Sequence, residues 1–389
     1  MPELIDAAAP DSPQATATIV RTLDGLLALR SEWTALLSLS RANTLCLTWE
    51  WIETWCAVFG NPMMELAVIV VTAGTRVVGI APFWVQRSRL LGFRVRTLRL
   101  VGAGEPDKDS VVSEYLDVIA EPGHEAQVAE TVALALERDV RWDRAVLTDL
   151  LEDSLIAKAL RPRLKQCGMA ADLEPAGFRY VITLPESLAA YYAGLPGDSG
   201  KRIPYRRRRL ARAGTLVERV VRDASELDGA FATLVALHTA RWKARGESGS
   251  FASADFLRFH RMLAARLLET GGLNFRILEI DGTAISALYN FRVSGVDYYY
   301  QSGINADFPG NHSPGTVALS YAIESAIEAG MRQFDFMRDD AKSYKSEFGC
   351  IEMPMAVAKF YSRTPRARAL QSAWALKGTL KRQPAGPTA

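Results

Sequence analysis

"NHSPGTVALSYAIESAIEAG", residues 311–330, predicts a helix whose first turn is opened by a serine, a proline and a glycine. Ser313 suits an N-cap, Pro314 has a φ preset for the first helical position, and Gly315 leaves the backbone bare. The apolar and alanine positions that follow predict a largely buried helix that ends at Gly330. A helix start of this kind is either an ordinary cap or a seat for an anion, since free N–H groups and the helix dipole both favour negative charge.

Apolar runs on both sides of this helix predict strands. They read LNFRILEID, TAISALYNFRV, VDYYYQSGIN, QFDFM and MPMAVAKFYS. A basic helix over about 199–213, the strand TLVERVVRD and two helices within 224–271 precede them. The first half of the chain has a similar order: ATIVRTL, helices through LDGLLALRSEWTALLSLS and LTWEWIETWCAVFG, then the strands ELAVIVVTAG, TRVVGIAPFWVQ, RVRTLRLVGAG and EYLDVIA, and RAVLTDL between two helices. The sequence therefore predicts mixed α/β layers in two halves of one plan.

Length and composition restrict the class of protein. With 389 residues, the chain is long enough for two domains, and its 49% hydrophobic and 23% charged residues are typical of a globular protein. The longest apolar runs have strand length, so no membrane span is predicted. The first residues lack the basic and apolar regions of a secretory signal, and we expect a cytoplasmic protein. Four cysteines without a CxxC pair and four histidines without HExxH spacing argue against a disulfide framework and a metal centre.

Net charge is +2, but one stretch is strongly basic. Residues 201–212, KRIPYRRRRLAR, hold seven basic side chains and no acidic one. On a helix, Arg206, Arg209 and Arg212 would form an exposed ridge. A solvated helix face is the simplest interpretation. The alternative is contact with phosphate, tRNA or a membrane surface through Lys201 to Arg212, whereas no DNA partner is predicted.

The order of these segments resembles a known family. LHTARWKARGESGSF, FHRMLAARLLETGGLNFRILEIDGTAISALYNF, YYYQSGINADFPGNHSPG, AIEAGMRQFDFMR and SYKSEFG are similar, in this order, to the CelD/BcsL-type acetyltransferases. That branch belongs to the GNAT acyl-CoA N-acyltransferases and is related to the FemAB peptidyltransferases. The resemblance implies a tandem of two GNAT-like domains, each a mostly antiparallel sheet flanked by helices. We expect a tail at 1–16, domains at 17–180 and 181–370, and a C-terminal end at 371–389.

The resemblance also implies a function. An acyl group, acetyl in the simplest case, would pass from acyl-CoA to an amine or hydroxyl of a small molecule or sugar, in cell-surface polysaccharide production. No metal is implied. The pantetheine would follow the strand that contains Gln301 and Ser302. The donor's diphosphate would rest on residues 313–316, namely Ser313, Pro314, Gly315 and Thr316.

Acyl transfer needs a base, an oxyanion stabiliser and a proton donor for the thiolate. By resemblance, Lys345 would neutralise the oxyanion or hold phosphate, and Tyr344 would protonate sulfur; a surface lysine beside a packed tyrosine is the alternative. Asp335 could be the base or an anchor for the next loop. His238 lies on an apolar helix face and is either a base or a core histidine.

Three further residues are candidates for acceptor binding. Trp242 follows His238 by one helical turn, Tyr299 points opposite to its neighbouring tyrosines on a strand, and Asp117 lies in SEYLDVI of the first half. Core packing and a strand edge are the alternatives for the last two. The usual Arg/Gln-x-x-Gly-x-Gly/Ala signature of GNAT enzymes is absent. Two rival functions therefore stay open: FemAB-like transfer from aminoacyl-tRNA, and a non-catalytic scaffold in a polysaccharide machine.

Overall fold

One continuous sheet runs through the computed structural model, which describes residues 14–61, 64–90, 92–310, 312–339 and 344–372. Its strand order is β1-β2-β3-β4-β6-β13-β7-β12-β11-β10-β9-β8, and β5 pairs with β3 off this path. The strands are β1 (Ala15–Val20), β2 (Glu65–Ala73), β3 (Arg76–Leu90), β4 (Phe93–Leu100), β5 (Ile119–Ala120), β6 (Arg144–Leu151), β7 (Ala170–Thr183), β8 (Leu216–Val220), β9 (Leu273–Ile280), β10 (Thr283–Val293), β11 (Val296–Ile304), β12 (Gln333–Asp339) and β13 (Ile351–Tyr361).

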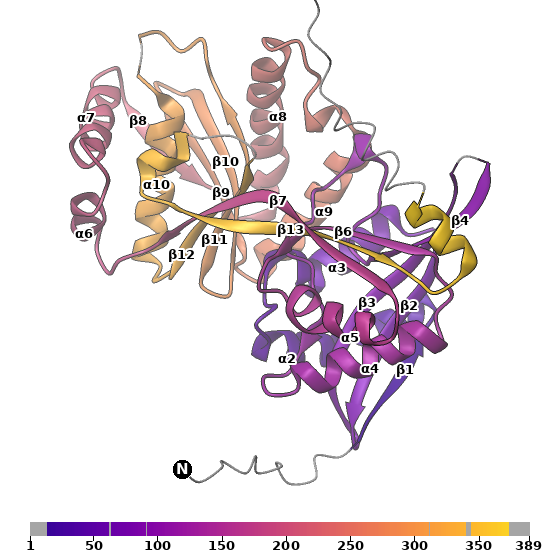
Figure 1. Ribbon diagram of the computed structural model, residues 1–389. Helices are drawn as coiled ribbons and strands as arrows, with labels where there is room; N and C mark the ends of the chain where they lie inside the picture. Colours follow the sequence, from indigo (N-terminus) through magenta and orange to yellow (C-terminus); the bar gives the residue numbers. More distant parts are fainter. Residues whose placement is uncertain (1–13, 62–63, 91, 311, 340–343, 373–389) are drawn as a thin grey trace, which may run out of the picture.

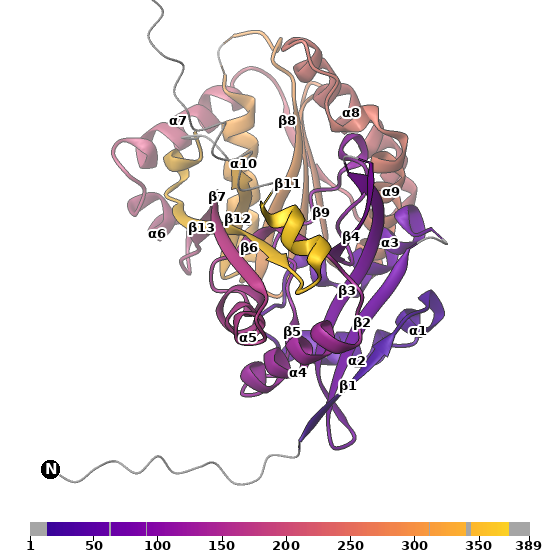
Figure 2. The ribbon, with the colours of Figure 1, turned by 45° about the vertical axis from the view of Figure 1, so that its right-hand side comes forward.

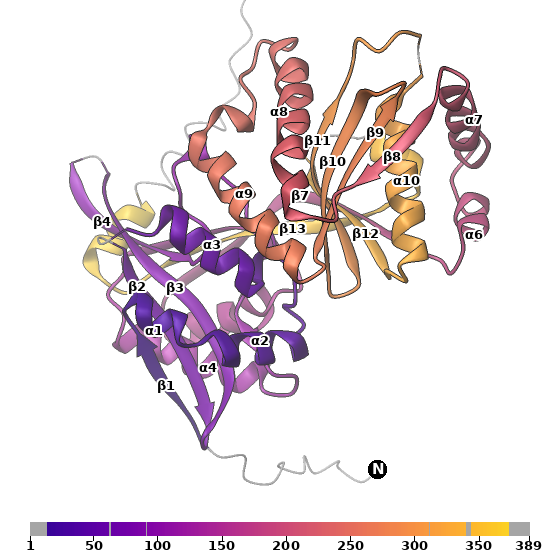
Figure 3. The same cartoon turned by 180° about the vertical axis from the view of Figure 1, so that it is seen from behind.

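Helices cover both faces of each half of this sheet. They are α1 (Leu23–Leu27), α2 (Arg30–Leu39), α3 (Trp49–Phe59), α4 (Glu125–Arg138), α5 (Arg161–Gln166), α6 (Leu188–Ala193), α7 (Ser199–Ala211), α8 (Leu227–Lys243), α9 (Ala254–Glu269) and α10 (Pro314–Glu328). Short turns of helix are η1 (Leu45–Leu47), η2 (Asp107–Asp109), η3 (Ile156–Leu160), η4 (Ala224–Glu226), η5 (Ser250–Ala252) and η6 (Tyr344–Phe348). In the second half, α8 and α9 lie on one side of strands β8–β12, and α10, α7 and α6 lie on the other (Figures 1 and 3).

The strands β7 and β13 belong to both halves. Residues 351–354 of β13 pair with residues 178–181 of β7, whereas residues 355–361 of β13 also pair with β6 of the first half. Figure 2 shows the two strands crossing between the halves. The expected domain boundary at 180/181 thus falls inside a strand that the two halves share.

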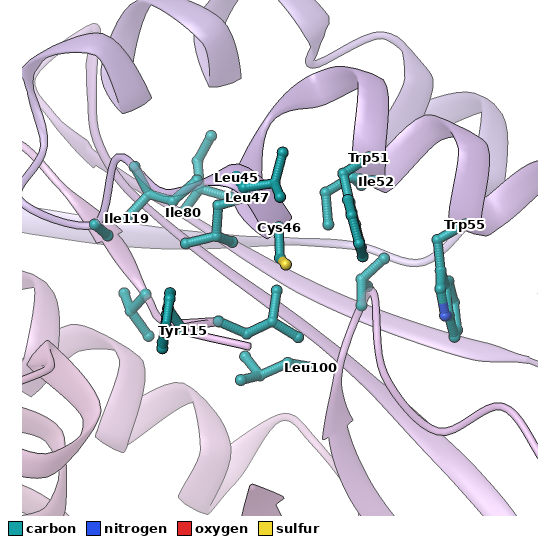
Figure 4. Close-up of a cluster of buried hydrophobic side chains, with 14 of the residues drawn as sticks. Leu45, Cys46, Leu47, Trp51, Ile52, Trp55, Ile80, Leu100, Tyr115 and Ile119 are labelled. Atoms are coloured by element: carbon teal, nitrogen blue, oxygen red, sulfur yellow. The ribbon is translucent and has the colours of Figure 1, made fainter. Parts of the chain in front are cut away.

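Two apolar cores fill the molecule. The larger spans the first half and the α8–α9 side of the second, and the smaller lies under α10. Figure 4 shows part of the first, where η1, α3 and strands β3–β5 meet around Leu45, Cys46, Leu47, Trp51, Ile52, Ile80, Leu100 and Ile119. The ring of Trp51 is 5.0 Å from that of Phe259 on α9 and 5.8 Å from that of Tyr300 on β11, edge to face. Aromatic packing therefore joins the two halves.

Most predicted strands are confirmed, but two predicted elements of the first half are wrong. The expected strand EYLDVIA is a strand only at Ile119–Ala120, because Val112 and Tyr115 have positive φ, which breaks an extended run. The expected helix through residues 23–40 divides into α1 and α2 at Leu29. The expected tails lie outside the described residues except at 14–16 and 371–372, where residues 15–16 already belong to β1.

The buried His260 predicts an acid-sensitive fold. It is fully buried among aromatic rings, neither ring nitrogen has a hydrogen-bond partner, and burial lowers its pKa to about 3. The unfolded chain binds the extra proton between the ordinary histidine pKa near 6.5 and this lower pKa, so the free energy of unfolding falls as pH decreases through that window.

His260→Phe should reduce the slope of the free energy of unfolding against pH by up to about 1.4 kcal/mol per pH unit. Urea titrations from pH 7.5 to pH 4 measure it. Equal slopes in both proteins would contradict the prediction. For each protein, the free energy of unfolding at pH 7.5 is the reference value for its own slope.

Candidate functional site

The site begins where two parallel strands separate. β11 and β12 pair only over Val296–Gln333, Asp297–Phe334 and Tyr298–Asp335, although β11 continues to Ile304 and β12 to Asp339. Met337 has φ of 60°, and the pairing of β12 with β7 shifts register at this point. The two strands therefore diverge after Tyr298, and α10 connects them.

The first turn of α10 faces the space that this divergence leaves. Ser313 has a left-handed backbone (φ 50°, ψ 56°) and its side chain makes no capping hydrogen bond, so the predicted Ser313 cap is wrong. Its carbonyl still accepts from the amide of Val317 at 3.2 Å. The amides of Gly315 and Thr316 belong to the first turn, which lacks partners within a helix, and no described side chain caps them. They remain available to an anion.

A cavity of about 540 Å³ lies against this helix end. Its walls combine α8, the end of β11, the loop after it, the first turn of α10 and η6. The residues that line the cavity include Arg241, Arg245, Tyr299, Ile304, Asp307, Ser313, Pro314, Gly315, Thr316 and Tyr344. A side chain at Gly315 would approach Ile304, whose Cδ1 lies 3.2 Å from an ideal Cβ. The structure therefore brings the four predicted diphosphate residues together with Tyr299 and Tyr344.

Two arginines of this cavity were not predicted. Arg241 lies in the last turn of α8 and Arg245 in the turn directly after the helix, and both line the cavity. The Arg245 guanidinium lies 5.7 Å from the ring centroid of Trp242. They provide positive charge opposite the open end of α10. The spacing in LHTARWKAR was the signal that sequence reasoning left unused.

Tyr344 and Tyr299 form a hydroxyl chain in the cavity wall. Desolvation raises the pKa of the Tyr344 phenol, and its hydrogen bond with Tyr299 raises it further, although the residue as a whole is 49% exposed. Tyr299 donates to Ser302 Oγ at 2.6 Å, which leaves the Tyr299 oxygen to accept from Tyr344. The Tyr344 hydroxyl therefore holds its proton at neutral pH.

Lys345 does not line the cavity. The residue is only 5% exposed, and its Nζ donates to the carbonyl of Phe336 and pairs with Asp339 Oδ2, each at 3.1 Å. The ammonium also lies 5.4 Å from the ring centroid of Tyr180. These contacts fasten η6 to β12 and thereby place Tyr344; a role for Lys345 on the oxyanion stays a prediction.

Asp335 anchors β12 to the rest of the protein. Its Oδ1 accepts from the amide of Met337 at 2.7 Å and from the hydroxyl of Tyr115 at 3.2 Å, and its Oδ2 pairs with Arg179 at 3.3 Å. Burial raises the pKa of this carboxyl, while Arg179 opposes the shift. Asp335 is fully buried and absent from the cavity lining, so of the two predicted roles the geometry supports the anchor.

His238 and Trp242 lie behind the cavity wall and not in it. The His238 ring is 4.9 Å from that of Phe251 and 5.8 Å from that of Trp242, and burial lowers its pKa to about 4. An ideal Cβ at Gly249 would come within 2.7 Å of His238 Cε1. The prediction of His238 as a base in the site is thus corrected: α8 turns this imidazole toward η5 and packs it in an aromatic core.

The remaining predicted residues are also placed. Asp117 borders a different cavity of about 480 Å³ in the first half, where it accepts from the amides of Leu155 (2.6 Å) and Ile156 (2.9 Å) at the start of η3. Burial raises its pKa to about 7. Asp117 is therefore a helix cap that the structure does not bring to Tyr299. Gln301 and Ser302 lie on β11 outside the cavity lining, with Ser302 supporting Tyr299.

The basic helix α7 is only partly exposed. Arg206 and Arg202 pair with Glu347 at 3.1 and 3.3 Å, and Arg207 pairs with Glu324. The predicted ridge of Arg206, Arg209 and Arg212 therefore loses its first member to an ion pair, because η6 packs against this helix. Arg202 is exposed as well as paired, and the exposed cations outside these ion pairs are Lys201, Arg208 and Arg209 on α7 and Arg212 at its C-cap.

Comparison with known proteins gives this geometry a family context. Residues 198–346, which include β8–β12, α10 and the cavity, match the family model described as Acetyltransferase (GNAT) domain. The mixed α/β fold in two halves agrees with the prediction, and the family match places a GNAT-like domain in the second half. No curated protein matches the chain significantly.

Solved structures with a similar fold cover most of the chain. FemX shares 12% identity, covers 85% of this chain and 95% of its own, and has a TM-score of 0.58. A second similar structure is the C-terminal DUF2156 domain of a protein described as a putative lysylphosphatidylglycerol synthetase from Agrobacterium fabrum. It shares 12% identity, the match covers 90% of this chain and 96% of that domain, and the TM-score is 0.50. A tandem GNAT protein from the clavulanic acid biosynthesis pathway shares 16% identity. The match covers 90% of this chain and 99% of that protein, with a TM-score of 0.45. At these identities the likeness concerns the fold.

Among the described residues, no helix combines the length and apolar character that crossing a membrane requires. The same residues contain no group of three or more histidine, cysteine, aspartate or glutamate side chains arranged to hold a metal ion.

The Asp335 anchor can be tested by stability. Asp335→Ala should lower the free energy of unfolding by about 3 kcal/mol, because it leaves the largely buried Arg179 guanidinium without its carboxylate. Glu174→Ala, which breaks the more exposed ion pair with Lys359, is the matched control and should cost less than about 1 kcal/mol. Urea denaturation measures both. Equal, small effects would show that Asp335 is not an anchor.

Proposed function

We propose that this protein is an acyltransferase that moves an acyl group, acetyl in the simplest case, from an acyl-CoA thioester to an amine or hydroxyl. One observation carries the proposal: a single cavity joins the open amides of α10 to Tyr344 and is lined by Arg241 and Arg245. A thioester carrier has a diphosphate at one end and a reacting sulfur at the other, and the cavity offers matching groups for both.

The donor's phosphates would bind at the positive end of the cavity. The amides of Gly315 and Thr316 and the dipole of α10 favour negative charge, and Arg241 and Arg245 add charged donors. The pantetheine arm would follow β11, whose edge is unpaired beyond Tyr298, toward Tyr299. This arrangement needs no Arg/Gln-x-x-Gly-x-Gly/Ala signature, since Arg241 in the last turn of α8 and Arg245 just after it supply the positive charge.

The chemistry requires one proton donor in the wall. The acceptor's nitrogen or oxygen attacks the thioester carbonyl carbon, the carbon–sulfur bond breaks, and the leaving thiolate takes a proton. Tyr344 is the group we assign to that proton, since its hydroxyl lines the cavity and its raised pKa keeps it protonated at neutral pH. The thiol product then leaves with its proton, and Tyr344 recovers one from solvent or from the acceptor.

For the acceptor we propose a sugar or a surface-polysaccharide precursor, as in the CelD/BcsL-type branch that the sequence resembles. The order and spacing of the segments from LHTARW to SYKSEFG support this placement.

An aminoacyl-tRNA donor is the second candidate. The exposed cations of α7 and its C-cap outside the ion pairs (Lys201, Arg208, Arg209 and Arg212) and the arginines of the cavity would also suit RNA phosphate. Product formation that requires charged tRNA and proceeds without acetyl-CoA would favour it. A non-catalytic scaffold would bind neither donor.

Donor binding tests the cavity directly. Arg241→Gln combined with Arg245→Gln should weaken binding of coenzyme A by about tenfold or more, because each removes a charged hydrogen-bond donor to phosphate. Isothermal calorimetry measures the affinity. Arg208→Gln with Arg209→Gln removes the same amount of charge from the exposed face of α7 and should leave the affinity for coenzyme A unchanged. No saturable binding by the wild type, or equal losses in both doubles, would reject the acyl-CoA site.

The assignment of Tyr344 predicts a kinetic effect without a binding effect. Tyr344→Phe removes the proton donor and keeps the ring, so kcat should fall by about a hundredfold while the affinity for coenzyme A stays the same. Thiol release with an amino-sugar acceptor, followed by mass spectrometry of the product, measures turnover. Tyr299→Phe removes a hydrogen-bond acceptor of Tyr344 but leaves the Tyr344 hydroxyl itself, and should reduce kcat less. Unchanged kcat in Tyr344→Phe would exclude it as the donor.

A further inference from the structure

The β3–β4 hairpin carries four arginines on one face. Arg87 stands directly opposite Arg96, and Arg89 stands directly opposite Arg94. Opposite residues in an antiparallel pair share a face, as do residues two apart on one strand. The four side chains thus form a two-by-two block, here called the arginine block. Like charges placed directly opposite each other destabilise a hairpin.

Little inside the protein neutralises this block. Arg87 pairs with Glu65 Oε2 at 2.8 Å, but among the described residues no carboxylate pairs with the guanidinium groups of Arg89, Arg94 and Arg96. The backbone of Arg94 is instead approached by another cation, because Arg366 donates to its carbonyl at 3.2 Å. Three of the four arginines therefore cost stability without a carboxylate partner among the described residues, which points to a partner outside the chain.

The positive surface continues beyond the hairpin. Arg96 borders a groove of about 830 Å³ whose wall also contains Arg138, Arg141, Arg363 and Arg368, all four exposed. Its two acids are already engaged: Glu137 pairs with Arg363 at 2.7 Å, and Asp143 Oδ2 accepts from the amide of Arg96 at 2.8 Å. A multivalent anion can reach this groove and the arginine block together.

An aromatic side chain is exposed at the first residue of β4. Phe93 is 70% exposed, the highest value among the large exposed hydrophobic side chains described. Its cross-strand neighbour is Leu90, so it belongs to the face opposite the arginine block. In Figures 1 and 3 the hairpin projects from the first half, next to the helical segment 365–372. An aromatic tip with arginines behind it fits the boundary between lipid headgroups and acyl chains.

We propose that the β3–β4 hairpin docks the protein on an anionic lipid bilayer. Phe93 enters the interface, the arginine block lies at the depth of the lipid phosphates, and the groove between Arg96 and Arg368 holds further headgroups. Lipid is favoured over nucleic acid because an apolar side chain leads the surface and the arginines follow it. This surface lies on the first domain, away from α10, and does not depend on the proposed acyl transfer.

Vesicle binding by the full chain tests the proposal. Wild type should sediment with vesicles of phosphatidylcholine and phosphatidylglycerol, and not with phosphatidylcholine alone. Arg89→Gln with Arg94→Gln should weaken binding by about twenty-five-fold, at roughly fivefold for each arginine removed. Phe93→Ser should weaken it by about tenfold. Arg208→Gln with Arg209→Gln, the matched loss of charge on α7, should bind like wild type.

Thermal melting separates docking from a structural role. Removal of opposed like charges should leave the Tm of the Arg89→Gln, Arg94→Gln variant at or above that of wild type. A lower Tm together with lost binding would make the arginines structural and overturn the proposal. The proposal would also be overturned if wild type did not bind the anionic vesicles, or if it bound tRNA through these arginines in place of lipid.

Discussion

The short parallel ladder between β11 and β12 is the constraint on which the site depends. Three residue pairs hold the strands together, and after Tyr298 they separate. Their separation does three things at once. It leaves an unpaired edge on β11, it points the first turn of α10 into the gap, and it lets η6 place Tyr344 on the opposite wall. The groups of the cavity come from four elements that only this divergence brings together.

The divergence is itself held from the first domain. Met337 takes a left-handed backbone that a non-glycine residue adopts at a cost, and Asp335 accepts its amide while binding Tyr115 of the other domain. One residue further, the amide of Arg338 donates to Glu114 and its guanidinium to Asp149, both from the first domain. Burial raises the pKa of Glu114 to about 8. The first domain therefore contributes to the site by fixing β12, without a side chain in the cavity.

Sequence predicted the elements and one end of the cavity better than it predicted the chemistry. The strands around α10 and the apolar helix itself followed from periodicity, which is a local signal, whereas the grouping of residues 313–316 with Tyr344 came from the family resemblance. Ser313 failed as a cap because its backbone is left-handed, whereas a capping serine has an extended backbone. His238 failed because the helical pattern places it on an apolar face of α8 but does not show whether η5 or the cavity lies against that face. Arg241 and Arg245 were missed because only the packing of α8 against β11 shows which way they point.

The shared strands have a consequence for biosynthesis. β6 of the first domain obtains its neighbour from residues 355–361, near the far end of the chain. At roughly 5–20 residues per second, a ribosome needs on the order of ten seconds or more between the emergence of β6 and that of its neighbour. Throughout that delay the nascent first domain has an unpaired sheet edge, which a chaperone or another part of the growing chain must shield from other chains.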